Sequence, residues 1–340
     1  MVTIVDIRGE EVYQHFIYET FKRITAQHPA HSFIFIFDKP YPPSFIFSEN
    51  VIAVVIKPQK ISLLNDLTIS SLLKKHKADV FVTAKSLSQT KVPQCLITVD
   101  KVTSKSLNKA QVIVTASEFS KKEIIEKYKI DENKIDVVYK GVDEIFQSIL
   151  FEEKEKIKEL YAGGNEYFLV AGAISSENIF FNLLKAFSVF KKMQKSNMQL
   201  LIAANVEVTG QSLEKLQLFK FKSDVKLLEK MTEKKFVAIM GASYAFVYPF
   251  AQDYSYALQA MKCGIPIVIN STGALPEICS DAVLYINPDT HKDIADKMML
   301  IFKDEKLRQQ LAEKGREQVK KYSWDKTVNS LWKSIEKTCR

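Results

Sequence analysis

The sequence predicts an α/β protein with two doubly wound domains, each built on a parallel sheet that helices cover on both faces. Short runs of β-branched and aromatic residues, such as 33–37 and 51–56, are apolar at every position. Buried parallel strands have this pattern because crossover helices cover both faces of their sheet. Helical spacing of apolar residues, as in 13–24 and 61–73, separates several of these runs. Such alternation of strands and helices is typical of doubly wound folds.

The strands of the first half follow one another at regular intervals. They are expected at residues 3–5, 32–37, 51–56, 80–82, 96–99, 112–114 and 137–139. Each run is short and is followed by polar residues, which mark the point where the strand ends. We therefore expect an N-terminal domain at residues 1–150.

The same rhythm restarts after a charged segment at residues 154–156 and two glycines at 163–164. The second set of strands is expected at 168–170, 200–202, 245–247, 267–269 and 283–285, with a helix at 182–193. We therefore expect a second domain at residues 151–322. Two such domains place a ligand in the cleft between the carboxyl ends of their strands.

Residues 323–340 are expected to form a final helix that packs back on the N-terminal domain. Ser323 belongs to the residue types that cap helices, because its hydroxyl can accept a hydrogen bond from a free backbone N–H group. Trp324 follows it and would anchor the helix by burying a large apolar surface.

The composition is that of an ordinary globular protein. Apolar residues make up 46% of the chain and charged residues 26%, which excludes a disordered or low-complexity protein. The four cysteines lie far apart in the sequence, so we expect free thiols in a reducing compartment. The N-terminal residues lack the pattern of a signal peptide, and the longest uncharged run, residues 236–252, is too short to span a bilayer. We expect a cytoplasmic protein, with peripheral contact at the inner face of the membrane as a second option.

The net charge of +8 permits attraction of an anionic acceptor, a membrane surface or a nucleic acid. No aromatic residues interleave with the basic clusters, such as residues 74–77, as a nucleic-acid stacking surface requires. We therefore favour a solvated, lysine-rich surface and expect no nucleic-acid partner.

Several well-known chemical motifs are missing from the sequence. There is no G-x-x-x-x-G-K-[ST], no G-x-G-x-x-G after a strand, no G-x-S-x-G and no H-E-x-x-H. There is also no D-x-D, the carboxylate pair with which many transferases hold a divalent metal ion. We therefore expect neither a metal ion nor a cofactor.

Two segments could instead hold a diphosphate through backbone N–H groups. In residues 170–178 a strand turns through a glycine into a helix, and in residues 247–266 a strand ends at a proline before a polar loop and a helix. The start of a helix favours an anion because its N–H groups are free and its dipole is positive there. The alternative is that Ser175, Ser176 and Asn178 are only turn and capping residues.

Several of these segments together resemble the family-4 retaining glycosyltransferases. The stretches that carry the resemblance are residues 114–120, 137–143, 260–266, 273–278, 282–288 and 322–324. The resemblance implies the GT-B architecture, in which two Rossmann-like domains have parallel sheets that face each other across a cleft. It also implies a nucleoside diphosphate sugar in the second domain, an acceptor in the first, and catalysis without a metal ion.

The sequence departs from the pattern of that family at its most informative positions. The family has a Glu-x7-Glu segment that contacts the donor sugar and its ribose, and here Asp253 and Gln259 take these two places, with the segment two residues short. An Arg and a Lys that grip the diphosphate in the family have no counterpart in residues 172–178. Lys140 or Lys262 could neutralise a phosphate instead, or be solvated.

The resemblance implies a set of site residues for two competing hypotheses. The first is a glycosyltransferase that moves a hexose to a saccharide or lipid-linked acceptor, and the second is a catalytically silent relative that binds a sugar nucleotide or a partner protein. The expected residues are Asp253 and Asp100 for catalysis, Gly172, Ser175, Asn178, Tyr254, Ser255, Gln259 and Glu277 for the donor, and Arg8 and Gly9 for the acceptor.

Overall fold

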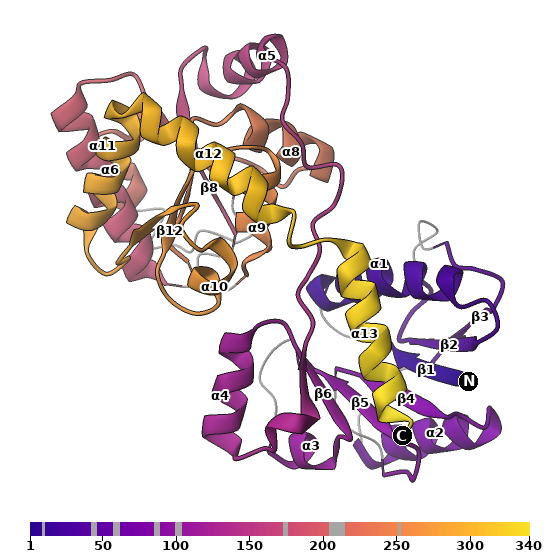
Figure 1. The fold of residues 1–340 in the computed structure, drawn as a ribbon. Helices are drawn as coiled ribbons and strands as arrows, with labels where there is room; N and C mark the ends of the chain where they lie inside the picture. The colour runs from indigo at the N-terminus through magenta and orange to yellow at the C-terminus, as the bar shows by residue number, and fades with distance from the viewer. Residues whose placement is uncertain are drawn as a thin grey trace. The chain divides into compact units, whose positions relative to one another are not determined.

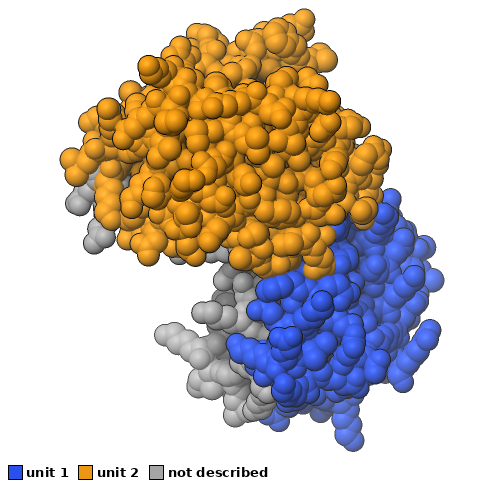
Figure 2. All heavy atoms as spheres, turned by 60° about the vertical axis from the view of Figure 1, so that its left-hand side comes forward, with its two compact units in different colours: residues 1–141, 322–340 blue, residues 142–321 orange. Residues whose placement is uncertain are grey.

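The computed structural model describes most of the chain and divides it into two compact units. The described residues are 1–8, 11–41, 46–56, 62–84, 89–98, 104–172, 176–203, 215–250 and 253–340. Unit 1 comprises Met1–Gly141 together with Tyr322–Arg340, and unit 2 comprises Val142–Lys321 (Figure 2). The C-terminal residues therefore belong to the same unit as the N-terminus.

Unit 1 is built on a seven-stranded parallel sheet with the order β3-β2-β1-β4-β5-β6-β7. Its strands are β1 (Val2–Asp6), β2 (Ser32–Phe37), β3 (Val51–Val55), β4 (Val80–Thr83), β5 (Gln94–Ile97), β6 (Val112–Thr115) and β7 (Ile135–Val137). The order reverses between β1 and β4, because the chain builds outward from β1 in one direction and then from β4 in the other. This reversal is the topological switch point of the sheet.

Helices cover both faces of this sheet. They are α1 (Glu11–Gln27), α2 (Ser62–Lys75), α3 (Ser104–Lys109), α4 (Glu118–Tyr128) and α13 (Trp324–Thr338), with a short 3₁₀ turn at Glu132–Lys134. Val5 and Phe35 lie in one buried cluster with side chains of α1 and α13, whereas Ile4 and Ile34 lie in another with side chains of α2. Alternate residues of a strand point to opposite faces, so strands covered on both sides are apolar throughout.

The final helix α13 is part of the core of unit 1 and packs against α1 (Figure 1). Ser323 caps it by accepting a hydrogen bond from Lys326 N, as predicted. The Trp324 ring is 7% exposed and lies 6.3 Å from the ring of Phe16. A Cβ atom on Gly141 would lie only 2.4 Å from the backbone nitrogen of Trp324. The start of α13 therefore lies so close to the segment after β7 that only glycine fits at position 141.

Unit 2 is built on a six-stranded parallel sheet with the order β10-β9-β8-β11-β12-β13. The strands are β8 (Tyr167–Ala171), β9 (Gln199–Ala203), β10 (Val225–Leu227), β11 (Ala245–Tyr248), β12 (Ile267–Asn270) and β13 (Leu284–Ile286). In this sheet the order reverses between β8 and β11.

The helices of unit 2 pack on this sheet in pairs. They are α5 (Phe151–Ala162), α6 (Glu177–Gln194), α8 (Glu233–Ala242), α9 (Ser255–Lys262), α10 (Leu275–Cys279), α11 (His291–Lys303) and α12 (Glu305–Val319), with a 3₁₀ turn at Lys222–Asp224. Helix α6 packs against α11, α9 against α12, and α5 against α8 (Figure 1).

The structure confirms the predicted α/β class with two parallel sheets. It corrects the sequence reading in three places. The strand expected at 96–99 is β5 at Gln94–Ile97. The strand expected at 137–139 is β7 at Ile135–Val137, because Asp131 caps the preceding 3₁₀ turn and the chain enters the sheet directly after it. Strand β10 was not predicted, because its three residues include a lysine and resemble a loop. In the part of the chain that the structure describes, no helix combines the length and the hydropathy needed to cross a membrane.

Candidate functional site

The carboxyl ends of β8 and β11 form the candidate site of unit 2. These two neighbouring strands flank the topological switch point, and ligands of doubly wound sheets bind in the crevice outside the carboxyl ends at that point. The chain leaves β8 at Gly172 and β11 at Pro249, and α6 and α9 begin after the respective loops. Four expected donor residues, Gly172, Asn178, Tyr254 and Ser255, therefore come from these two connections.

Gly172 is the point at which two aromatic rings approach the end of β8. It has a φ of +99°, a conformation that residues with a side chain rarely adopt. A Cβ atom added there would lie 3.1 Å from Cε2 of Tyr248 and 3.2 Å from Cε2 of Tyr256. The centroids of these two rings are 5.8 Å apart. The glycine is thus required by both its backbone conformation and its neighbours.

Asp253 is held by hydrogen bonds at both its backbone and its side chain. Its backbone N–H donates to the hydroxyl of Tyr248 at 3.3 Å, and its Oδ1 accepts from the backbone N–H of Ser255 at 2.9 Å. The backbone carbonyl of the buried Tyr254 accepts from the N–H groups of Ala257 and Leu258. These contacts start helix α9 and leave the Asp253 side chain partly exposed.

Asn270, at the end of β12, ties the neighbouring loop to this region and was not predicted from the sequence. Its Nδ2 donates to the carbonyl of Pro249 at 3.0 Å, and its Oδ1 accepts from the N–H and the hydroxyl of Thr272, both at 3.0 Å. An asparagine that ends a buried strand before a Ser-Thr-Gly turn is the signal that could have revealed it.

The two tyrosine hydroxyls of the site are shifted toward their protonated form. Burial raises the pKa of Tyr248, and the nearby carboxylate of Asp253 adds to this effect. Burial and the same carboxylate also raise the pKa of Tyr256. Both groups are therefore neutral hydrogen-bond donors at neutral pH.

Gln259 and Lys262 follow on α9. The Gln259 side chain is partly exposed, and its Oε1 is buried without a hydrogen-bond partner among the residues that the structure describes. Lys262 lies in the last turn of the helix and pairs with Glu144 at 2.9 Å. Its position at the far end of α9 from Ser255 separates it from the loop by about 10 Å along the helix axis.

The start of α6 carries no cation. Ser176 caps the helix by accepting a hydrogen bond from Ile179 N, and Glu177 and Asn178 are exposed in the first turn. Ser175 lies outside the described residues. Glu277 lies in the first turn of α10 and is partly exposed.

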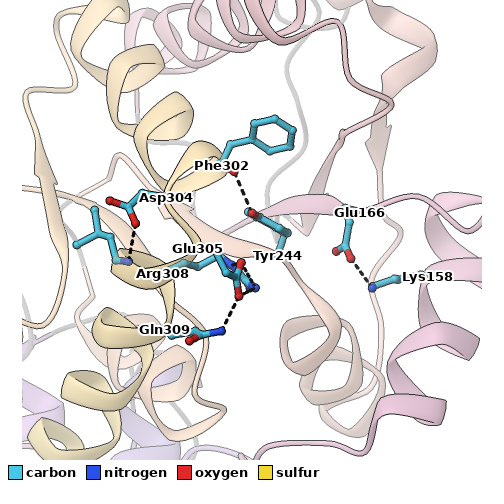
Figure 3. A network of polar contacts seen from close by, with 9 residues as sticks. Lys158, Glu166, Tyr244, Phe302, Asp304, Glu305, Arg308 and Gln309 are labelled. Carbon is cyan, nitrogen blue, oxygen red and sulfur yellow. Dashed lines mark hydrogen bonds and ion pairs between the residues drawn. The ribbon is translucent and has the colours of Figure 1, made fainter.

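A polar network lies at the opposite, amino ends of β8 and β11 (Figure 3). Lys158 pairs with Glu166, which precedes β8. The Tyr244 hydroxyl donates to the carbonyl of Phe302 at 3.3 Å, and the Arg308 guanidinium lies 4.5 Å from the centre of the Tyr244 ring. This network joins helices to the sheet at the edge away from the candidate site.

Unit 1 has a buried ion pair at its own switch point. Arg8 follows β1, and its Nε and Nη2 donate to the two carboxylate oxygens of Asp6 at 2.8 and 2.7 Å. The two side chains are 4% and 1% exposed. Burial lowers the pKa of Arg8, but the hydrogen bond and charge of Asp6 and the charge of Asp38 outweigh it and raise this pKa overall. The other residues expected on this side, Gly9 and Asp100, lie outside the described residues.

The described residues contain no group of three or more His, Cys, Asp and Glu side chains that could hold a metal ion. The thiols of Cys95, Cys263 and Cys279 are buried, and burial raises the pKa of each to about 12. These cysteines therefore do not present a reactive thiolate at neutral pH.

Comparisons with known protein sequences show that this chain is similar to glycosyltransferases. Residues 151–318 match the family described as Glycosyl transferases group 1. The O-antigen chain mannosyltransferase RfbU of Salmonella typhimurium is 25% identical over 191 residues, which cover 55% of this chain and 50% of that protein. The O-antigen chain mannosyltransferase B of Escherichia coli is 23% identical over 250 residues, which cover 68% and 63%. The chain thus spans between half and two thirds of the length of these relatives.

Solved structures show the same fold over nearly the whole chain. A glycosyltransferase from Rickettsia africae superimposes with a TM-score of 0.83 at 16% identity and covers 100% of this chain and 98% of that one. HepE from Anabaena in complex with UDP and glucose has a TM-score of 0.78 at 11% identity, with coverage of 98% and 99%. The predicted fold, with two Rossmann-like domains of the GT-B type, is confirmed.

Proposed function

We propose that this chain, which belongs to the group 1 glycosyltransferases through residues 151–318, transfers a hexose from a nucleoside diphosphate sugar to a saccharide or lipid-linked acceptor. The observation that carries the proposal is that the family match spans unit 2 and includes both loops at its switch point. Because two relatives are O-antigen chain mannosyltransferases, mannose is the first sugar to test.

In this proposal the donor binds at the carboxyl ends of β8 and β11. Asp253 addresses the donor sugar, Gln259 hydrogen-bonds the ribose, and Glu277 positions the donor from the first turn of α10, after β12. The contact between Asp253 Oδ1 and Ser255 N supports this role, because it fixes the carboxylate at the start of α9. Asn178 and Gly172 contribute the start of α6 from the other side of the switch point.

Transfer with retention of configuration needs two kinds of electrostatic help. Positive charge develops on the sugar ring in an oxocarbenium-like transition state, and negative charge grows on the leaving diphosphate. A carboxylate such as that of Asp253 stabilises the positive charge on the sugar ring. The N–H groups and dipoles at the starts of α6 and α9 stabilise the negative charge on the leaving diphosphate. The proposal requires no metal ion. On the acceptor side it assigns Arg8, with Gly9 and Asp100.

Calorimetry with UDP-, GDP- and ADP-sugars tests the proposal, beginning with GDP-mannose. Binding followed by sugar transfer or donor hydrolysis is expected for the unmodified chain. An Asp253→Asn substitution should abolish turnover, whereas Asp296→Asn, a control at an exposed aspartate that pairs with Lys292, should not. If no nucleotide binds at millimolar concentration, the proposal that the chain is a glycosyltransferase is refuted. Binding without turnover would instead identify a silent nucleotide-sugar-binding relative.

A further inference from the structure

Tyr256 lies where the first β-strand of unit 2 ends. It is the second residue of α9, and side chains of a helix lean toward the helix N-terminus, so its ring reaches back toward the loops. The ring lies against Gly172, against Tyr248 at 5.8 Å and against Phe236 at 6.1 Å between ring centres. It thus covers the glycine through which the chain turns from β8 toward α6.

The hydroxyl of Tyr256 differs from those of other tyrosines in this unit. Tyr167, Tyr244 and Tyr285 each donate a hydrogen bond to a backbone carbonyl, and Tyr248 accepts one from Asp253 N. The Tyr256 hydroxyl has no hydrogen-bond partner among the residues that the structure describes, and the residue as a whole is partly exposed. Because its pKa is raised by burial and by the Asp253 carboxylate, it keeps its proton at neutral pH.

The chemistry that suits this place is that of a phosphate oxygen. In doubly wound sheets a diphosphate lies at the first strand-to-helix turn, next to the glycine and the N-terminus of the following helix. Here Gly172 follows the strand and α6 begins at Glu177, and the sequence from residue 172 to residue 178 contains no Lys or Arg to pair with a diphosphate. A protonated phenol close to the glycine can donate a hydrogen bond to an anionic oxygen, and such charge-assisted bonds are stronger than neutral ones.

We propose that Tyr256 is a donor-binding residue whose hydroxyl donates a hydrogen bond to the diphosphate of the nucleoside diphosphate sugar, in the turn where cationic side chains are missing. The inference rests on the proposed function, because it assumes that the donor binds at this switch point. It assigns the residue to recognition of the diphosphate, not of the base or the sugar.

Calorimetry on the full chain tests this assignment with three probes, namely GDP-mannose, GDP and guanosine, or their uridine counterparts if UDP-sugars bind instead. The Tyr256→Phe variant keeps the ring against Gly172 and removes only the hydroxyl. It should bind the sugar nucleotide and the diphosphate about tenfold or more weakly, because a hydrogen bond to a charged group is lost. Its affinity for the nucleoside should not change.

The Tyr244→Phe variant is the matched control, because it removes a tyrosine hydroxyl at the amino end of β11, away from the site (Figure 3). It should bind all three probes like the unmodified chain. Unchanged affinity of Tyr256→Phe for the diphosphate would overturn the inference, and so would an equal loss for the nucleoside or a loss confined to the sugar nucleotide. If the unmodified chain binds no nucleotide, the proposed function itself fails.

Discussion

The Gly172→Ala substitution should destabilise unit 2 and weaken donor binding, because the structure leaves no room for a methyl group there. Two costs add up. A non-glycine residue at a φ of +99° is strained by about 1–3 kcal/mol. The new Cβ would also lie 3.1–3.2 Å from the rings of Tyr248 and Tyr256, and such crowding costs about 1–3 kcal/mol. The free energy of unfolding should therefore fall by about 2–6 kcal/mol.

Gly163→Ala is the control for this experiment. Gly163 lies in the same unit with a positive φ of +59°, but a Cβ there would meet nothing within 4 Å. Its substitution should cost only the backbone strain, about 1–2 kcal/mol, and leave donor binding unchanged. Urea denaturation of both variants, together with calorimetry of donor binding, measures the difference. Equal destabilisation by the two substitutions would refute the close packing of the tyrosine rings on Gly172.

Three further predictions concern unit 1. Asp6→Asn should lower the free energy of unfolding by about 3–5 kcal/mol, because it leaves the buried charge of Arg8 without its counter-ion. Trp324→Ala should cost about 3–5 kcal/mol, because it removes a buried ring that anchors the final helix. Burial lowers the pKa of His28, and the charge of His31 adds to this effect, so stability should be complete above the unfolded pKa of about 6.5 and fall as the pH drops toward the lower folded value.

Thermal and urea denaturation measure all three effects. The Lys292→Gln variant, changed at an exposed residue outside unit 1, serves as the control for Asp6→Asn and Trp324→Ala. It should change the free energy of unfolding by less than about 0.5 kcal/mol. For the third, the His28→Gln variant should lack part of the pH dependence that sets in as the pH falls below about 6.5. An unchanged pH profile in that variant would contradict the role of His28 in the pH dependence of stability. A loss of clearly less than about 3 kcal/mol in Asp6→Asn would contradict the role of the buried ion pair.

The fold class could be predicted because buried parallel strands have a local signature. Segments such as 112–114 and 168–170 are apolar throughout, and a helical stretch follows each of them, so the pattern identifies the element without knowledge of its neighbours. Strand β10 escaped this reasoning because it has only three residues at the edge of the sheet, of which Lys226 and Leu227 are only partly buried. The pattern fails where burial is incomplete.

Part of the candidate site was also accessible from sequence order. The place of Asp253 and Ser255, directly before and at the start of a helix, follows from a strand, a proline, a polar loop and a helix in succession. The position of Tyr256 against Gly172 could not be predicted, because these residues are far apart in the chain and meet only once β8 and β11 are neighbours. The Asp6–Arg8 pair was missed because the sequence suggested Arg8 only as an acceptor contact and gave no sign of a buried partner.

Hydrogen exchange of backbone amides, measured by mass spectrometry with and without a bound nucleoside diphosphate, tests the location of the donor site most directly. The account predicts slower exchange in peptides that cover residues 172–178 and 249–259, and no change in peptides that cover the amino ends of β8 and β11. Nucleotide binding that leaves the exchange of both loops unchanged, or that protects only other parts of unit 2, would contradict it.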